Sequence, residues 1–257
     1  MMAEPTIIFE NSDFLVVNKS AGLLVHSAHI KSQSVHRKSE STLADWLMGR
    51  YPELKKVGDE PAVRPGIVHR LDRETSGVMV VARTQKTFDF LKGLFQRHEV
   101  LKTYQALVWG RVRDEEGVIK TPIALKPGTT KRAVRGKNLK MMKEAETAYR
   151  VVRRLAFDNN ELTLLSVSPR TGRTHQIRVH LSSIEHSVVG DKLYGTSKIK
   201  EQKAKMLGIT RQFLHADSIE FTAPDGGRMR FSADLPDDLS QALAKLVRAP
   251  RDFHLSD

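Results

Sequence analysis

The fold of this 257-residue chain is constrained most by a series of short, β-rich runs that turn residues separate. The first two lie in TIIFENSDFLVVNK, where Asn11–Asp13 splits them, and a continuous apolar run follows at 78–82. Later runs of the same kind are KTYQALVWG, AETAYRVVRRL, NELTLLSVSP, SIEFTAP and GRMRFSADL. Runs of this length and composition, bounded by turn residues, are typical of strands.

Segments with a helical pattern are fewer than segments with a strand pattern. Thr42 starts one helix with a capping box, and Thr84 caps another that we expect to end near His98. RTHQIRVHLSSIEH and DLSQALAKLVRA also have helical spacing, the second with Asp237 or Asp238 as its expected cap. Because strands outnumber helices and do not alternate strictly with them, the sequence predicts an α+β fold. We expect a large, mainly antiparallel mixed sheet with flanking helices and loops.

The length fits one large domain or two small ones, and we interpret residues 1–257 as a single domain. No repeat of 20–50 residues is visible. A polar stretch at 27–41 lacks periodicity and is predicted to be a loop, and 51–66 is predicted to be a linker-like loop.

Several classes of protein and site are excluded or disfavoured. The chain has no cysteine, which excludes disulfides, thiolate zinc sites and cysteine nucleophiles. It has neither a membrane-length apolar run nor a secretion signal, so we expect a cytoplasmic protein that does not bind membranes. GDKLYGTSK has Thr196 where a phosphate loop has its lysine, and no glycine-rich motif indicates a nucleotide cofactor. The histidine pairs His26/His29 and His175/His180 lack an accompanying carboxylate, so no metal is expected.

The charge indicates a nucleic-acid partner. Lys and Arg number 42 against 30 Asp and Glu, giving a net charge of +12 and a pI near 9.9. Residues 126–143 contain no acid, and with Pro127, Gly128 and Gly136 they are predicted to form a mobile basic loop that contacts phosphates. The basic residues of this segment are Lys126, Lys131, Arg132, Arg135, Lys137, Lys140 and Lys143.

Three polar residues are candidates for chemistry. Asp72 lies between Arg70 and Arg73 in a tight loop before the apolar run at 78–82. Taken locally, Asp72 is a turn cap paired with a neighbouring arginine. Tyr104 in its strand is by itself a core tyrosine, and Arg178 at the edge of a helix's apolar face is by itself a surface arginine. No single one of these residues establishes catalysis.

Together, the motifs resemble those of the RluA-type pseudouridine synthases. HRLDRETSG is similar to the family's most specific signature, and the resemblance extends from about residue 6 to 235. The other matching segments are NKSAGLLVHS, in which Ser20 replaces a proline, KTYQALVWG, PRTGRTHQIRVHLSSIEHSVVGDKLYG and LHADSIEFTAP.

The resemblance implies the pseudouridine synthase catalytic fold and an enzyme that isomerises uridine in RNA without metal or cofactor. Asp72 matches the essential aspartate, Tyr104 the tyrosine that packs against the target base, and Arg178 the arginine that pairs with the aspartate. Arg70 matches the arginine that fills the gap left by a flipped nucleotide, and Ile177 is expected to form an apolar wall. The further expected substrate-binding residues are His69, Lys102, Arg173, Lys131, Arg132, Arg135 and Lys137.

These residue types suit the reaction. A uridine in paired RNA must leave the stack before a carboxylate can reach C1′. A nearby guanidinium favours the ionised carboxylate, and an aromatic ring can stack on the base. Two routes stay open for Asp72: covalent attack on the sugar or base, or proton abstraction giving a glycal.

We expect the partner to be rRNA or tRNA and the protein to be a monomer. The first motif begins by Asn18, so we expect no preceding RNA-binding domain of the S4 type. Two other classes compete with this interpretation. One is an RNA-binding or RNA-folding protein without catalysis, which the basic charge alone would explain. The other is a nucleotide-base hydrolase, which would release free uracil.

Overall fold

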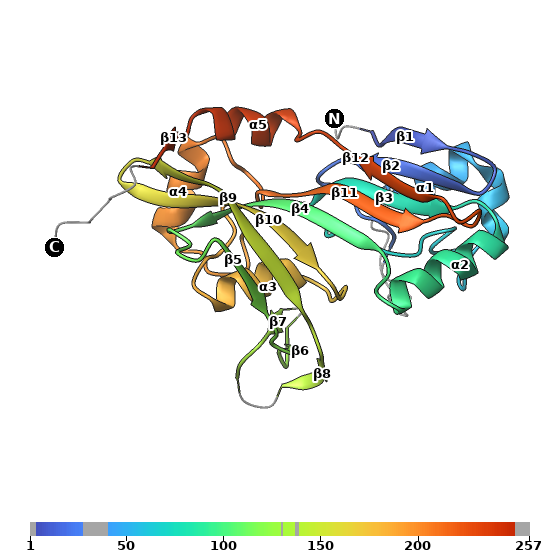
Figure 1. Ribbon diagram of the computed structural model, residues 1–257, viewed down its shortest axis with the longest axis horizontal. Helices are drawn as coiled ribbons and strands as arrows, with labels where there is room; N and C mark the ends of the chain where they lie inside the picture. Colours follow the sequence, from blue (N-terminus) through green and yellow to red (C-terminus); the bar gives the residue numbers. More distant parts are fainter. Residues whose placement is uncertain (1–3, 28–40, 130, 137–138, 250–257) are drawn as a thin grey trace, which may run out of the picture. The chain divides into compact units, whose positions relative to one another are not determined.

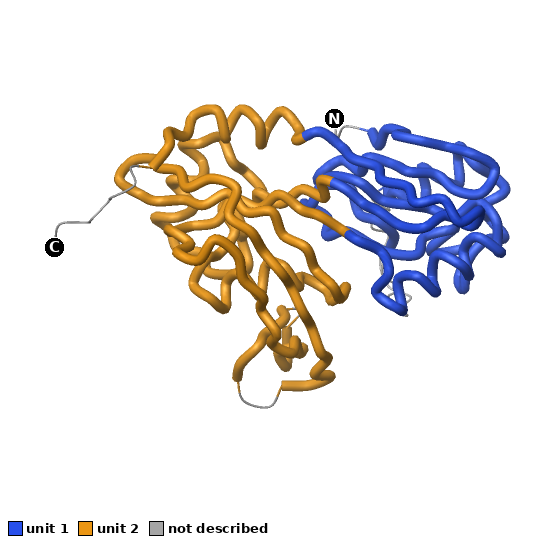
Figure 2. The backbone as a smooth tube through the Cα atoms, viewed as in Figure 1, with its two compact units in different colours: residues 1–101, 218–234 blue, residues 102–217, 235–257 orange. Residues whose placement is uncertain are grey.

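The computed structural model describes residues 4–27, 41–129, 131–136 and 139–249. Contacts within the chain divide it into two compact units (Figure 2): unit 1 comprises residues 1–101 and 218–234, and unit 2 comprises residues 102–217 and 235–257. Strand β11 (Leu214–Thr222) contributes its first four residues to unit 2 and the remainder to unit 1. The interpretation of the chain as a single domain stays a prediction.

Unit 1 is built on antiparallel strands (Figure 1). β1 (Thr6–Glu10) pairs with β2 (Phe14–Lys19), and β2 pairs with β3 (Ser76–Ala82). β12 (Arg228–Ser232) pairs with the end of β11. The Asn11 side chain turns the first hairpin by accepting the backbone N–H groups of Asp13 and Phe14, each at 2.9 Å. The two strands predicted on either side of Asn11–Asp13 are therefore confirmed, and they form a hairpin.

Two helices in the described part of unit 1 begin where their capping residues indicate. α1 (Leu43–Arg50) has Thr42 as its N-cap in a full capping box with Asp45. α2 (Gln85–Gln96) has Thr84 as its N-cap. The stretch expected to be a linker-like loop contains a short 3₁₀ helix, η1 (Pro52–Lys56), because a proline at the first position suits a helical turn.

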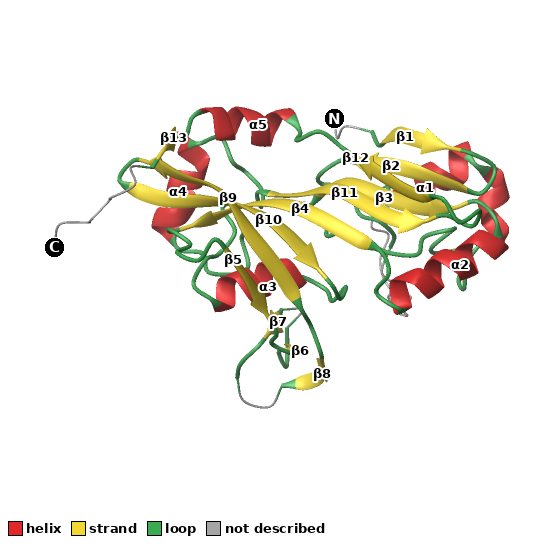
Figure 3. Ribbon diagram, in the orientation of Figure 1, coloured by secondary structure: helices red, strands yellow, loops and turns green. Residues whose placement is uncertain are grey.

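Unit 2 contains a longer antiparallel arrangement (Figure 3). β10 (Asn160–Pro169) lies between β4 (Leu101–Trp109) and β9 (Thr147–Phe157). β5 (Glu116–Ile119) and β13 (Val247–Arg248) also pair with β9.

Among its described residues, unit 2 has three helices: α3 (Gln176–Ser183), α4 (Lys198–Met206) and α5 (Asp237–Ala244). The expected cap of α5 is wrong, because Pro236 is the N-cap and both aspartates lie inside the first turn. α4 was not expected, since Ala204 is its only buried residue and the helix leaves almost no apolar pattern in the sequence.

The predicted basic loop is in part a small antiparallel sheet. β6 (Ile123–Leu125) pairs with β7 (Arg132–Ala133) on one side and with β8 (Lys140–Lys143) on the other. We call residues 123–143 the basic arm. The expectation of a loop is corrected in part by these strands, and a core of Ile123, Ala145, Val179 and Tyr194, with Val134 packed against it, joins the arm to α3. The mobility expected for this segment stays a prediction. Lys137 lies outside the described residues.

The α+β fold class with mainly antiparallel strands is confirmed. Most of the predicted polar loop, residues 28–40, including His29, lies outside the described residues. No helix in the described part of the chain is long and apolar enough to cross a membrane. Among the same residues, no group of three or more His, Asp or Glu side chains is arranged to hold a metal ion.

Candidate active site

The loop that carries Asp72 leads directly into β3 of unit 1. The Thr75 backbone N–H donates to the Asp72 carbonyl at 3.1 Å and closes a turn. Leu71 is buried beside a half-buried Asp72. The loop is therefore anchored by an apolar side chain on one side of Asp72 and by a closed turn on the other.

A buried lysine from the first motif fixes this loop. Lys19 is fully buried, and its Nζ donates to the carbonyl oxygens of Ser20 at 2.8 Å, Leu23 at 2.9 Å and Arg73 at 3.1 Å. Gly22 and Arg73 add two reciprocal bonds, one from the Gly22 N–H to the Arg73 carbonyl and one from Arg73 Nε to the Gly22 carbonyl, both 2.9 Å. Sequence reasoning did not single out Lys19; a lysine ending the apolar run FLVVNK was the available signal.

His69 anchors the other side of the same loop. Its Nε2 accepts the Val80 N–H of β3 at 3.0 Å, and its ring stacks on Phe95 of α2 with centroids 4.7 Å apart. The accepting Nε2 places the ring proton on Nδ1 of a neutral imidazole. A substrate-binding role for His69 stays a prediction.

Arg70 is exposed, and its charge acts on the neighbouring part of unit 1. The pKa of His26 is lowered mainly by burial, against the effect of its hydrogen bond to the Ser27 carbonyl, and the charges of Arg70 and Arg64 lower it further. This positive field suits an RNA phosphate.

In unit 2, β4 presents Tyr104. This tyrosine is buried, lies opposite Val167 of β10, and shares one face of β4 with Lys102. Burial lowers the pKa of the half-buried Lys102 to about 8, because the charged ammonium loses hydration there. Lys102 can therefore change charge under mildly alkaline conditions.

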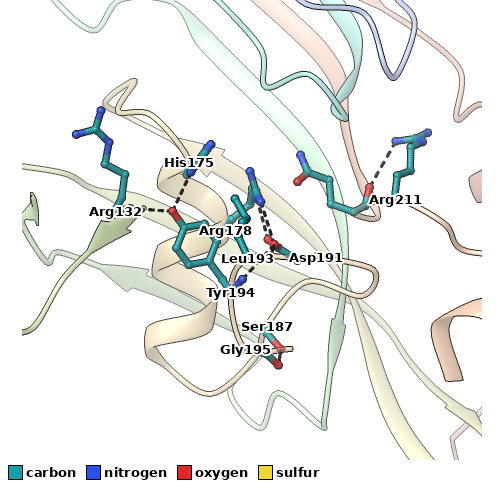
Figure 4. Close-up of polar contacts among 10 residues, drawn as sticks. Arg132, His175, Arg178, Ser187, Asp191, Leu193, Tyr194, Gly195 and Arg211 are labelled. Atoms are coloured by element: carbon teal, nitrogen blue, oxygen red, sulfur yellow. Dashed lines mark hydrogen bonds and ion pairs between the residues drawn. The ribbon is translucent and has the colours of Figure 1, made fainter. Parts of the chain in front are cut away.

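Arg178 lies on α3 and is only 5% exposed, which corrects its local interpretation as a surface arginine. Its Nε and Nη2 donate to the two carboxylate oxygens of Asp191 at 2.7 and 2.9 Å, and its guanidinium lies 5.2 Å from the ring centroid of Tyr194 (Figure 4). Every residue of α3 from Gln176 to Leu181 is buried, so this arginine needs a carboxylate partner. The expected pairing of Arg178 with Asp72 stays a prediction.

Asp191 is held by a tight turn in the segment GDKLYG. Gly190 has a φ of +74°, and a Cβ there would lie 2.1 Å from the Arg211 carbonyl oxygen, so only glycine fits. Asp191 Oδ1 also accepts the backbone N–H groups of Leu193 at 2.8 Å and Tyr194 at 3.2 Å. Sequence reasoning missed Asp191, although an aspartate directly after a turn glycine was a usable signal.

Tyr194 connects the basic arm to this group of residues. Its Oη accepts the Arg132 backbone N–H at 2.9 Å and lies 2.8 Å from His175 Nδ1 (Figure 4). Its ring belongs to the small core beneath the arm. One side chain thus contacts β7, the start of α3 and the Arg178 guanidinium. This connection was not anticipated from the sequence.

The remaining predicted residues of unit 2 surround α3 and the arm. Ile177 is buried next to Arg178, and its role as an apolar wall stays a prediction. Arg173 Nε donates to the Glu144 carbonyl at 3.0 Å. Lys131 and Arg135 are exposed on the arm and Arg132 is half-buried. Their contacts with RNA stay predictions.

A family model described as RNA pseudouridylate synthase matches residues 13–183. An uncharacterised RNA pseudouridine synthase of Aquifex aeolicus is 42% identical over 205 residues, which cover 79% of this chain and 60% of that protein. The ribosomal large subunit pseudouridine synthase D of Nitrosomonas europaea is 38% identical over 248 residues, which cover 95% of this chain and 66% of that protein. The chain therefore spans less than two thirds of the length of these two relatives.

The structure is also similar to solved structures. Human RNA pseudouridylate synthase domain containing 1 superposes with a TM-score of 0.69 at 24% identity, covering 90% of this chain and 84% of that one. The fold expected from the motif resemblance is confirmed.

Proposed function

This chain belongs to the RNA pseudouridylate synthase family, and on that premise we propose that it is an RNA pseudouridine synthase. The observation that carries the proposal is the loop around Asp72. It lies within the matched residues, and Lys19, Gly22 and Arg73 fix its backbone beside a half-buried carboxylate. A preorganised carboxylate is what a reaction at one nucleotide of a large RNA requires.

The proposed reaction is an isomerisation. The N1–C1′ bond of a flipped uridine breaks, the base turns, and a C5–C1′ bond forms. C5 then loses its proton and N1 gains one, so that no atoms are added or removed. Asp72 is the proposed essential carboxylate, either as the nucleophile toward sugar or base or as the base that gives a glycal.

Tyr104 and Arg178 have supporting roles in the proposal. The Tyr104 ring packs against the target base, where stacking contributes about 1–3 kcal/mol, and its hydroxyl is the candidate for proton transfer. The motif resemblance implies that Arg178 favours the ionised form of Asp72. The bidentate pair with Asp191 supports a guanidinium that is held in one orientation.

We propose RNA as the substrate and large-subunit rRNA as the first RNA to test. The similar protein of Nitrosomonas europaea is named for the ribosomal large subunit. The net charge of +12 and the basic arm favour binding to phosphates, and Arg70 is proposed to fill the gap left by the flipped uridine.

The test uses RNA with tritium at C5 of uridine. Joining C5 to C1′ releases this tritium to water, so the wild type should release it from unmodified large-subunit rRNA, from tRNA or from both. Asp72→Asn should release none. The matched control is Asp59→Asn, which removes a carboxylate whose partner is Lys92, on the surface of unit 1, and should leave the rate unchanged.

The products separate the competing classes. Pseudouridine in digested RNA supports an isomerase, whereas free uracil with abasic RNA indicates a base hydrolase. Binding without release of tritium from either RNA supports an RNA-binding protein. Normal tritium release by Asp72→Asn would contradict the proposed role of Asp72.

A further inference from the structure

Two exposed methionines lie on β8, one of the two edge strands of the basic arm. Met141 is 68% exposed and Met142 is 58% exposed, between Lys140 and Lys143 on β8. Neighbouring residues of a regular strand point to opposite faces, so one of two adjacent apolar residues ordinarily faces the sheet's packed side. Here neither does.

A β-bulge explains why both methionines are exposed. In the pairing of β8 with β6, Lys140 lies opposite Leu125 and Lys143 lies opposite Ile123, so β8 contains one residue more than its partner. Met141 has a φ of +52°, a left-handed conformation that is costly for a side chain of this kind. Bulges re-aim side chains and are common beside functional sites. This bulge presents apolar surface to solvent at the expense of backbone strain.

The charge around the pair identifies the kind of partner. The sequence from 126 to 143 has no acid, and Lys126, Lys131, Arg135, Lys140 and Lys143 of the arm are exposed. A second copy of a chain with net charge +12 would be repelled. A partner that offers negative charge and flat apolar surface together is RNA, through its phosphates and its bases.

We propose that Met141 and Met142 pack against unstacked bases of the RNA while Lys140 and Lys143 bind the adjoining phosphates. The inference rests on the proposed function, because it takes RNA as the ligand. Methionine suits this contact, since its thioether is polarisable and pairs favourably with aromatic rings. Apolar side chains, methionine among them, also act as wedges between bases in other nucleic-acid complexes.

The arm is anchored well enough to hold such a contact in place. The Arg132 backbone on β7 is bonded to Tyr194, and Ile123 on β6 packs in the same small core as Val179 of α3. The methionines are thus presented from a sheet fixed to the helix that carries Arg178. RNA bound there is held by unit 2 at a defined distance from α3.

Oxidation footprinting tests the contact in the wild-type protein. Dilute hydrogen peroxide converts exposed methionines to sulfoxides, and mass spectrometry gives the rate at each site. The RNA is the transcript that releases tritium in the assay above, used unlabelled. It should slow oxidation of Met141 and Met142 several-fold. Met206 on α4, which is 60% exposed, is the internal control and should oxidise at an unchanged rate.

Polyphosphate, which has charge but no bases, separates base contact from charge. Equal protection of the methionines by polyphosphate and by RNA would overturn the inference. The inference would also be overturned if an RNA that the wild type modifies does not protect Met141 and Met142. In that case the proposed function would still stand. If protection of Met141 and Met142 grows with protein concentration in the absence of RNA, the two methionines instead contact a second copy of the chain, which overturns the inference. Failure to modify any RNA would refute the proposed function itself.

Variants give a second measurement. The double variant Met141→Ala/Met142→Ala should weaken RNA binding about tenfold, equivalent to about 1.4 kcal/mol, without changing its salt dependence. Lys140→Gln/Lys143→Gln should instead flatten the salt dependence. Met206→Ala is the matched control and should bind like the wild type. Wild-type affinity of the double methionine variant would overturn the inference.

Discussion

At the scale of single residues, a buried ammonium is stable only when its protons are bound by acceptors. Lys19 meets this requirement through three carbonyl groups, one of which belongs to the loop of Asp72. A buried polar group that loses its partner costs about 1–3 kcal/mol. We therefore expect Lys19→Met to lower the free energy of unfolding by roughly 3 kcal/mol, measured by urea denaturation. Pseudouridine formation should fall more than RNA affinity, because the loop loses its anchor.

Lys92→Met is the matched control for this substitution. Lys92 is partly exposed and pairs with Asp59 at the surface, so its loss should change stability by less than about 1 kcal/mol. Wild-type stability of Lys19→Met would show that the loop does not depend on the ammonium.

Lys102 gives a prediction about pH. An ordinary lysine stays charged at pH 9, but burial lowers the pKa of Lys102 to about 8, so its charge is lost as pH rises from 7 to 9. If Lys102 binds a phosphate, the slope of log affinity against log salt should become shallower by about 0.7 over this range. The measurement is a salt titration of RNA binding at both pH values.

Lys102→Met serves as the comparison for that titration. Its slope should be shallower at pH 7 and should not change between pH 7 and 9. A wild-type slope that is the same at both pH values would exclude Lys102 from the contacts with phosphates.

The residues of the candidate site could be predicted from the sequence only in part. Asp72, Tyr104 and Arg178 lie in motifs that resemble those of a known family, so they could be identified from the sequence. Asp191 pairs with Arg178 across thirteen residues of chain, and the turn at Gly190 helps to position Asp191 for this pair. Such a pair has no periodic signature, and neither has the contact of Tyr194 with Arg132.

At the scale of elements, Tyr194 joins β7 to the start of α3. Tyr194→Phe keeps the ring in the small core and beside Arg178 but removes the acceptor of the Arg132 N–H and the partner of His175. We expect faster hydrogen exchange in the basic arm and a loss of roughly 1–2 kcal/mol in stability. The KM for RNA should rise more than kcat falls, because the arm that we propose to bind RNA loses its fixed position.

Hydrogen-exchange mass spectrometry of peptides from the arm and from β1–β2 provides the control within one experiment. Exchange in β1–β2 should not change. If exchange in the arm also stays at the wild-type rate, the hydroxyl of Tyr194 does not hold the arm.

The charges of the arm should set the salt dependence of RNA binding. Neutralising Lys131, Arg132, Arg135 and Lys137 together should weaken binding and make the salt slope shallower by about 0.7 for each phosphate that is no longer bound. A variant with glutamine at Lys55, Lys56, Lys198 and Lys205, all exposed, carries the same change of net charge elsewhere. An equal effect in both variants would show that net charge, and not the arm, determines binding.

Elements with local signals could be predicted, and those that depend on distant contacts could not. Thr42 and Thr84 cap their helices within three or four residues, so the sequence alone locates these starts. β7 has two residues and exists because Ile123–Leu125 provides a partner strand. No pattern within the run of lysines and arginines indicates that pairing.

At the scale of the whole molecule, the fold class followed from the number and order of strands and helices. The division into units did not, because residues 218–234 belong with residues 1–101 although more than a hundred residues separate them in the chain. The pairing of β12 with the end of β11 keeps that segment in unit 1. Contacts of this kind depend on which strands become neighbours, and hydrophobic periodicity does not encode that choice.

At this scale we also expect that a substitution can abolish the chemistry without changing the affinity for RNA. The proposed RNA binding uses a net charge of +12 spread over many residues, whereas the proposed chemistry requires one carboxylate. Asp72→Asn raises the net charge by one and retains the backbone bond from Thr75 that closes the turn. We expect RNA affinity within about twofold of wild type, with the same salt slope, and no pseudouridine. Filter binding and tritium release on one RNA preparation measure both, and a variant that loses affinity and activity together would place Asp72 in binding instead of catalysis.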